Sequence, residues 1–147
     1  MVKTGLKYLA AYGMWIITLL IGLWFCVVSW QGFHKLLLEY YVRESYIYAA
    51  RASLYEKVFV VIIGFLWALL MIVSEETYRK TALTDQLWIR AAKINGLILI
   101  MVFLADALLL LLNGIQNNGW LHWIILVIEL VAGLGFTWYA RTKKSTK

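Results

Sequence analysis

The sequence predicts an all-α integral membrane protein, a bundle of four transmembrane helices that forms a single domain over residues 1–147. Three observations predict this class. Hydrophobic residues make up 63% of the chain and charged residues 15%, whereas soluble globular proteins have about 45–50% and about 25%. Four apolar stretches are each long enough to cross the ~30 Å hydrocarbon core of a bilayer. Lys and Arg gather at the ends of these stretches, which is typical of membrane topology and not of a nucleic-acid-binding surface.

The first apolar stretch is the longest. Between Lys7 and His34 it runs for 26 residues without a charged or histidine side chain, enough for a helix of about 39 Å. A signal peptide has an apolar region of only about 7–15 residues. We therefore expect a span over residues 8–33 that stays as an uncleaved anchor. Cys26 is the only cysteine, so no intramolecular disulfide or thiolate metal cluster can form.

Residues 34–56 are too many for a simple turn between two spans. Apolar and aromatic side chains recur there at helical spacing, which predicts a helix lying on or extending beyond the outer face. Its tyrosines either anchor the segment among lipid headgroups or dock another protein. The docking candidates are Tyr40, Tyr41, Tyr46 and Tyr48.

Three further spans are expected over residues 55–75, 93–114 and 119–140, with residues 76–92 as a cytoplasmic loop. The uncharged part of the second span covers only 17 residues between Lys57 and Glu75, near the lower limit for crossing a bilayer. Before the third span, Thr84 or Asp85 can cap the incoming helix.

The orientation follows from the basic residues. Ten of the 14 Lys and Arg residues fall on the side that carries both termini, which places the termini in the cytoplasm by the positive-inside rule. The membrane is then the cytoplasmic membrane or an equivalent energy-transducing membrane. The basic tail over residues 141–147 is expected to contact anionic lipids through Arg141, Lys143 and Lys144.

Two acidic residues lie at membrane depth, Asp106 in the third span and Glu129 in the fourth. Such a residue costs about 2.5–3.5 kcal/mol on insertion scales and usually faces a partner inside the bundle. If a tight hairpin joins these spans, the two carboxyls reach similar depths, and His122 lies about 10 Å nearer the outer face than Glu129. Helical phase puts further polar residues on the same faces; the expected intramembrane polar cluster is Asp106, Glu129, Asn95, Asn113 and His122.

The sequence leaves four roles open for the two acids. They can tie the bundle together as neutral groups, pair with a basic residue of a neighbouring subunit, form a proton or cation pathway, or line a lipid or cofactor pocket.

Small residues predict where the helices approach closely. The first span carries a stripe of small and polar residues, the second a pair of small residues four apart, and the fourth a glycine on the face of Glu129. These residues are Thr18, Gly22 and Ser29, then Gly64 and Ala68, then Gly133.

The sequence contains no catalytic motif and no spacing typical of a metal site. His34 and His122 are candidate ligands for a haem or a chlorophyll-type pigment, because imidazoles in helical bundles bind such cofactors. No cofactor is the first expectation.

These observations favour a non-catalytic accessory or assembly subunit that packs against other membrane subunits or further copies of itself within the lipid bilayer. The main alternative is proton- or ion-coupled transport through Asp106 and Glu129. A haem- or pigment-binding membrane subunit is the third hypothesis. We expect neither an enzyme nor a nucleic-acid partner.

Overall fold

The computed structural model describes residues 2–41, 46–84, 86–113 and 119–144, without the side chains of residues 2–3, 40–41, 46–50, 113 and 144. These residues form four helices: α1 (Val2–Tyr41), α2 (Tyr46–Thr81), α3 (Leu87–Asn113) and α4 (Trp120–Lys144). All four are long and apolar enough to cross a membrane. The predicted all-α architecture of four apolar spans is confirmed, and the chain is a multi-pass membrane protein in contact with lipid.

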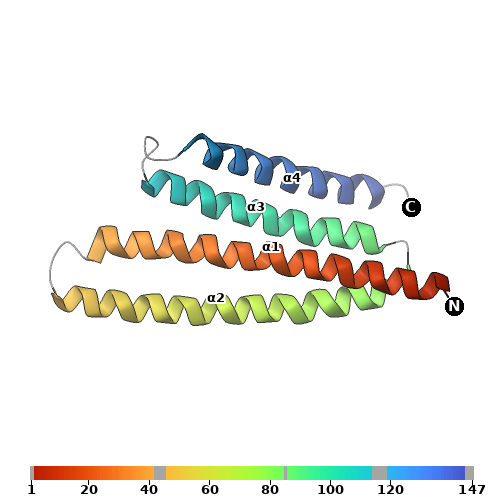
Figure 1. Ribbon diagram of the computed structural model, residues 1–147, viewed down its shortest axis with the longest axis horizontal. Helices are drawn as coiled ribbons and strands as arrows, with labels where there is room; N and C mark the ends of the chain where they lie inside the picture. The colour runs from red at the N-terminus through yellow and green to blue at the C-terminus, as the bar shows by residue number, and fades with distance from the viewer. Residues whose placement is uncertain (1, 42–45, 85, 114–118, 145–147) are drawn as a thin grey trace.

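The helices lie side by side in the order α2, α1, α3, α4 (Figure 1). α1 packs along both α2 and α3, and α3 packs along α4, while α2 touches α3 only briefly. Within the described residues, α4 makes no close backbone contact with α1 or α2. The four helices therefore form an open layer and not the closed bundle expected from the sequence. Lipid solvates apolar helix faces well, so no hydrophobic force closes the layer.

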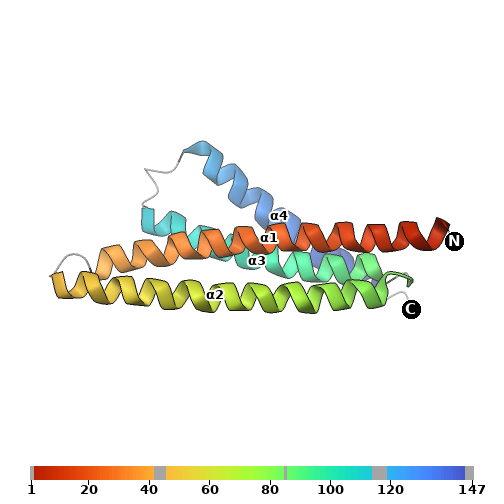
Figure 2. The same ribbon diagram turned by 60° about the horizontal axis from the view of Figure 1, so that its bottom comes forward.

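Both termini lie at one end of the molecule, hereafter the terminal end, and the opposite end is called the distal end (Figure 1). α1 and α2 have 40 and 36 residues and are thus about 60 Å and 54 Å long. Both continue past α3 and α4 at the distal end (Figure 2). The described part of the segment 34–56 consists of these two extensions. A single helix lying along the outer face, one form of our expectation, is not what the structure shows.

Direct contacts join the two extensions. The Phe33 and Phe59 rings stack with their centroids 4.2 Å apart, and Leu37 and Ala52 are buried nearby. Glu56 accepts a 3.0 Å hydrogen bond on Oε1 from Trp30 Nε1, and the same oxygen lies 3.0 Å from His34 Nδ1. These pairs explain why the two helices run on together instead of folding flat.

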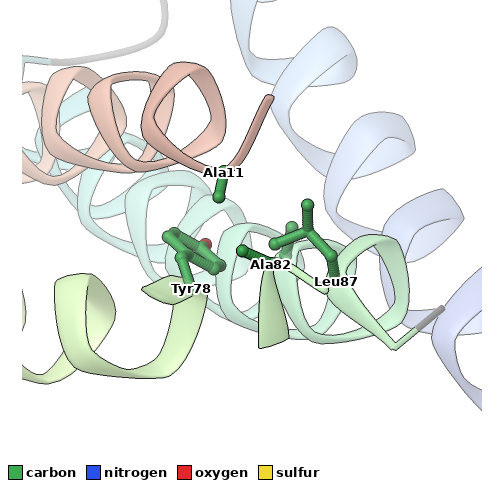
Figure 3. Close-up of a cluster of buried hydrophobic side chains, with 5 residues drawn as sticks. Ala11, Tyr78, Ala82 and Leu87 are labelled. Atoms are coloured by element: carbon green, nitrogen blue, oxygen red, sulfur yellow. The ribbon is translucent and has the colours of Figure 1, made fainter. Parts of the chain in front are cut away.

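At the terminal end, a small apolar core fixes α1 against the turn between α2 and α3. Ala11, Ala82 and Leu87 surround the ring of Tyr78, which is almost fully buried (Figure 3). The turn closes through Thr84, whose backbone N–H and hydroxyl both donate to the Thr81 carbonyl at 3.0 and 2.9 Å. The Thr84 carbonyl in turn accepts from the Leu87 N–H. The other expected cap, Asp85, lies outside the described residues.

Glycines set the closest helix crossings. On α1, a Cβ at Gly22 would lie 2.9 Å from Leu70 Cδ2 and 3.2 Å from the Trp67 ring, so α2 packs closely against this glycine. A Cβ at Gly133 would lie 3.0 Å from Ile100, and one at Gly96 would lie 2.9 Å from Thr137. Close approach at Gly22 and Gly133 is thus confirmed. The prediction for Gly64 is wrong, because nothing lies within 4 Å of its Cβ position.

Candidate functional site

A trough runs between α1 and α4, with α3 as its floor. It exists because α1 and α4 both pack on α3 and not on each other. Helical phase turns Asn95 and Asp106 of α3 toward this side, as the sequence predicted, and both are buried. Two groups of polar side chains occupy the trough and its α1 wall, one nearer the terminal end and one nearer the distal end.

The group nearer the terminal end is neutral and joins three helices. The Thr18 hydroxyl lies 2.7 Å from the Tyr78 hydroxyl and 2.8 Å from Asn95 Oδ1. It also lies 3.0 Å from the Met14 carbonyl of its own helix. Thr18, Tyr78 and Asn95 belong to α1, α2 and α3, and each is at most 2% exposed. We call these three residues the hydroxyl–amide cluster.

Thr18 is the centre of this cluster. Its hydroxyl has a single hydrogen and two acceptor lone pairs. The Tyr78 hydroxyl can donate to it, and Thr18 can then donate to either Asn95 or Met14. Every polar group at the centre therefore has a partner, and this cluster holds α1, α2 and α3 together without any charge.

The group nearer the distal end is ionisable and joins α1, α3 and α4. The Trp24 indole N–H donates a 3.1 Å hydrogen bond to Glu129 Oε1, which bridges the trough from α1 to α4. His122 Nε2 lies 3.5 Å from Asp106 Oδ1, across the α3–α4 contact. Asp106 is 3% exposed and Glu129 5%, whereas Trp24 is 47% exposed and forms the outer wall. We call these four residues the carboxyl–imidazole cluster.

This second cluster is incompletely satisfied. Glu129 Oε2 and His122 Nε2 are buried and have no hydrogen-bond partner among the described residues. A buried polar atom without a hydrogen bond costs about 1–3 kcal/mol. The cluster therefore has unused capacity to bind a donor, a proton or a cation.

The position of His122 differs from the expectation. We expected it to lie well outside the depth of the two carboxyls, yet its imidazole reaches Asp106. That expectation assumed that α3 ends and α4 begins at the same level. Figure 1 shows that α4 instead begins set back from the end of α3, toward the middle of the molecule. Depth counted along each helix from a shared hairpin level was therefore wrong for α4.

The remaining predicted site residues are placed as follows. His34 contacts Glu56 on the α1–α2 pair and has no role in the trough. Arg141 and Lys143 are exposed near the terminal end of α4. The docking candidates and two other residues have side chains outside the described part of the chain, and their roles stay predictions: Tyr40, Tyr41, Tyr46, Tyr48, Asn113 and Lys144.

The two histidines lie apart, on different helix pairs, so they do not share a ligand site. Among residues 2–41, 46–84, 86–113 and 119–144, no group of three His, Cys, Asp or Glu side chains converges on one point. His34 faces Glu56 and His122 faces Asp106, so each imidazole has a carboxylate on a different helix pair.

Sequence reasoning missed two residues of the site, Trp24 and Tyr78. Tyr78 had a signal, because Ser74, Tyr78 and Thr81 recur at spacings of four and three and all three are buried. Trp24 had none, since a tryptophan in an apolar helix is equally suited to facing lipid. Only the packing order of the helices brings its indole to Glu129.

The chain matches no known family model, and no curated protein and no solved structure matches it. Its function is therefore inferred from the trough and the side chains within it.

Proposed function

We propose that this chain is a non-catalytic accessory or assembly subunit of a larger membrane complex, with both termini in the cytoplasm. The observation that carries the proposal is the carboxyl–imidazole cluster at the edge of an open layer. In a closed bundle a fourth helix would cover such a cluster on all sides. Here Glu129 is hydrogen-bonded to the half-exposed Trp24 of α1, and α4 makes no close backbone contact with α1 among the described residues.

A helix from a partner subunit is the occupant that would best supply hydrogen bonds to the unpaired atoms of this cluster. Buried polar atoms in hydrocarbon find partners on neighbouring helices, because lipid tails offer none. A donor from a second subunit, either an Arg or Lys side chain or a neutral hydroxyl or amide, would complete Glu129 Oε2. The cytoplasmic orientation rests on the positive-inside rule, since Arg79, Lys80 and Lys143 all lie near the terminal end.

The test is photo-crosslinking in the native membrane. A photoreactive side chain replaces Trp24 at the cluster edge in one variant and Val61 in a control variant; Val61 is 71% exposed on the outward face of α2. We expect a discrete crosslinked protein from position 24 and only lipid adducts from position 61. A further variant, Glu129→Gln, should reduce co-purification of that protein in mild detergent. A chain that purifies alone and crosslinks only to lipid at both positions would contradict the proposal.

A second function, proton- or cation-coupled transport, is favoured by one observation. Asp106 and His122 approach within 3.5 Å across α3 and α4, and buried ionisable residues of this kind are found in proton relays inside membranes. Reconstitution of the chain in vesicles with a pH-sensitive dye inside tests it. Flux that disappears in Asp106→Asn and Glu129→Gln supports transport, whereas equal leakage with and without the chain argues against it.

A further inference from the structure

The half of the trough nearer the terminal end is an open groove with a volume of about 640 Å³. Its α1 wall is formed by Met14 and Ile17, and its α4 wall by Phe136 and Tyr139. Asn95 lies on its α3 floor, and Trp88 stands at the terminal end of that floor. The hydrogen bond between Trp24 and Glu129 separates this groove from the distal half of the trough, because Glu129 lies one helical turn beyond the α4 wall.

The lining changes in character along the groove. Toward the middle of the molecule the walls are hydrocarbon, from Met14, Ile17 and Phe136. Nearer the terminal end come the indole of Trp88 and the phenol of Tyr139, both partly exposed. Amphipathic rings of this kind favour the headgroup level of a bilayer. None of the lining residues is acidic.

Two lysines continue the walls beyond these rings. Lys7 precedes Met14 by seven residues, two helical turns, and so lies on the same face of α1. Lys143 follows Phe136 by seven residues and Tyr139 by four, which places it on the groove face of α4. Both lysines are exposed, and both lie near the terminal end, where α1 begins and α4 ends (Figure 1).

The order of hydrocarbon walls, amphipathic rings and then ammonium groups matches the order of groups along a phospholipid: acyl chain, ester and phosphate. A zwitterionic lipid would bring its own cation to the two lysines, whereas an anionic lipid would not. We propose that this groove is a binding site for one anionic phospholipid, with an acyl chain between α1 and α4 and its phosphate beside Lys7 and Lys143. The site is separate from the partner contact proposed above and does not depend on it.

The groove owes its width to small residues on α4. A Cβ added at Gly135, which lines the groove, would meet nothing within 4 Å, so a side chain can start there without a clash and extend into the groove. Gly64 on α2 gives a matched control. It is equally unobstructed and lines a different groove of about 460 Å³ between α1 and α2. Leucine at either glycine therefore adds the same side chain, and only Gly135→Leu obstructs the proposed site.

The tail offers a second matched control. Arg141 lies two residues from Lys143 but on the other side of α4, where it lines a neighbouring hollow with Leu134 and Trp138; Gly135 borders both this hollow and the groove, so Arg141→Gln is the variant that tells the two apart. Simple attraction of a basic tail to an anionic surface would treat Arg141 and Lys143 alike. A phosphate site in the groove would depend on Lys143 and not on Arg141.

The experiment is a lipid titration of the delipidated full chain in mild detergent, followed by native mass spectrometry. The probes are dioleoylphosphatidylglycerol and dioleoylphosphatidylcholine, and the measured quantity is the apparent Kd of the first bound lipid. We expect phosphatidylglycerol to bind more tightly, and the variant with both Lys7→Gln and Lys143→Gln to bind it about thirtyfold more weakly. Gly135→Leu should also weaken binding, while Gly64→Leu and Arg141→Gln should leave the Kd unchanged.

Three outcomes would overturn the proposal. Equal affinity for the two lipids would mean that the headgroup is not recognised. Equal weakening by Arg141→Gln and Lys143→Gln, with no effect of Gly135→Leu, would reduce the effect to surface charge. A photoreactive side chain at Phe136 that captures a protein and no lipid in the native membrane would assign the groove to a partner helix. Thermal unfolding of each variant in detergent checks that the fold is retained, since all the substituted positions are sterically open or exposed.

Discussion

The two polar clusters beside α3 are built from different chemistry. The hydroxyl–amide cluster of Thr18, Tyr78 and Asn95 is neutral, and short hydrogen bonds join its members across three helices. The carboxyl–imidazole cluster holds two acids and an imidazole, and two of its buried atoms lack a hydrogen-bond partner among the described residues. The first cluster is almost fully buried, and in the second both acids are buried while Trp24 is half exposed. The hydrogen bonds of the first cluster are complete within this chain, whereas those of the second cluster are incomplete among the described residues.

The difference teaches how a small membrane protein separates structure from assembly. A neutral hydrogen bond between helices costs little to bury and contributes on the order of 1 kcal/mol in lipid. A buried carboxyl costs more, and its cost is recovered only where a suitable partner arrives. We therefore expect substitutions in the first cluster to affect folding of the isolated chain, and substitutions in the second to affect what the chain binds.

The largest effect should come from forcing α4 away from α3 at their close crossing, which would also separate the members of the second cluster. Gly133→Leu places a side chain against the backbone N–H of Ile100, which lies 3.2 Å from the Cβ position, and must push α4 off α3. Overpacking of this kind costs up to about 3 kcal/mol. The loss should be measured as the free energy of unfolding in detergent. Gly64→Leu, at an open position, should be neutral, and an equal loss in both variants would contradict this view of the α3–α4 crossing.

The next effect concerns the centre of the first cluster. Thr18→Val keeps the shape of the side chain but leaves Tyr78 and Asn95 without their shared partner. We expect a loss of about 2 kcal/mol in unfolding free energy, since buried polar groups then lack a hydrogen bond. The control is Thr77→Val, because the Thr77 hydroxyl donates only to the Val73 carbonyl of its own helix. Equal losses in the two variants would show that Thr18 has no special role between the helices.

A substitution in the second cluster should change binding and leave the stability of the isolated chain almost unchanged. Glu129→Gln keeps an oxygen for the Trp24 indole and adds an N–H group. The isolated chain should therefore change in unfolding free energy by less than about 1 kcal/mol, while capture of a partner or ion flux is lost. Unfolding in detergent and co-purification from native membrane are measured on the same variant. A large loss of stability together with unchanged co-purification would reverse the roles of the two clusters.

The smallest effect should come from the bridge across the trough. Trp24→Phe keeps an aromatic wall and removes only the N–H donor to Glu129. A single hydrogen bond between membrane helices averages about 0.6 kcal/mol, so the change in unfolding free energy should be of that size. Glu129→Met removes the acceptor at similar side-chain size, so the Trp24→Phe/Glu129→Met double variant closes a thermodynamic cycle. Strict additivity of the two losses would show that the bridge contributes nothing to stability.

The four spans, their apolar character and the polar face of α3 could be predicted, because span length and helical phase are local properties of the sequence. Asn95 and Asp106, whose spacing puts them on one face of α3, are both buried. The packing order could not be predicted, since every helix carries an apolar surface that lipid covers equally well. The pairing of Asp106 with His122 could not be predicted for a related reason. It depends on the level at which α4 begins relative to α3, and no local sequence pattern determines that level.

The predictions of close helix packing at glycines were only partly right, and the reason is physical. Gly133 and Gly64 both occur in patterns typical of close helix packing, yet only Gly133 is covered by another helix. A small residue permits close approach without requiring it. The face on which a neighbour lies decides the outcome, and that face is fixed by distant contacts such as the Thr18 hydrogen bonds.

The paired distal extensions of α1 and α2 have a mechanical consequence. After the uncharged stretch, α1 continues from His34 to Tyr41, a length of about 10 Å. The Phe33–Phe59 stack and the contacts of Glu56 join the two helices at the base of this extension. A double-helical stalk bends far less than a loop of the same length. The paired extensions therefore keep a fixed direction relative to the rest of α1 and α2, so a contact made on one of them is passed to both helices.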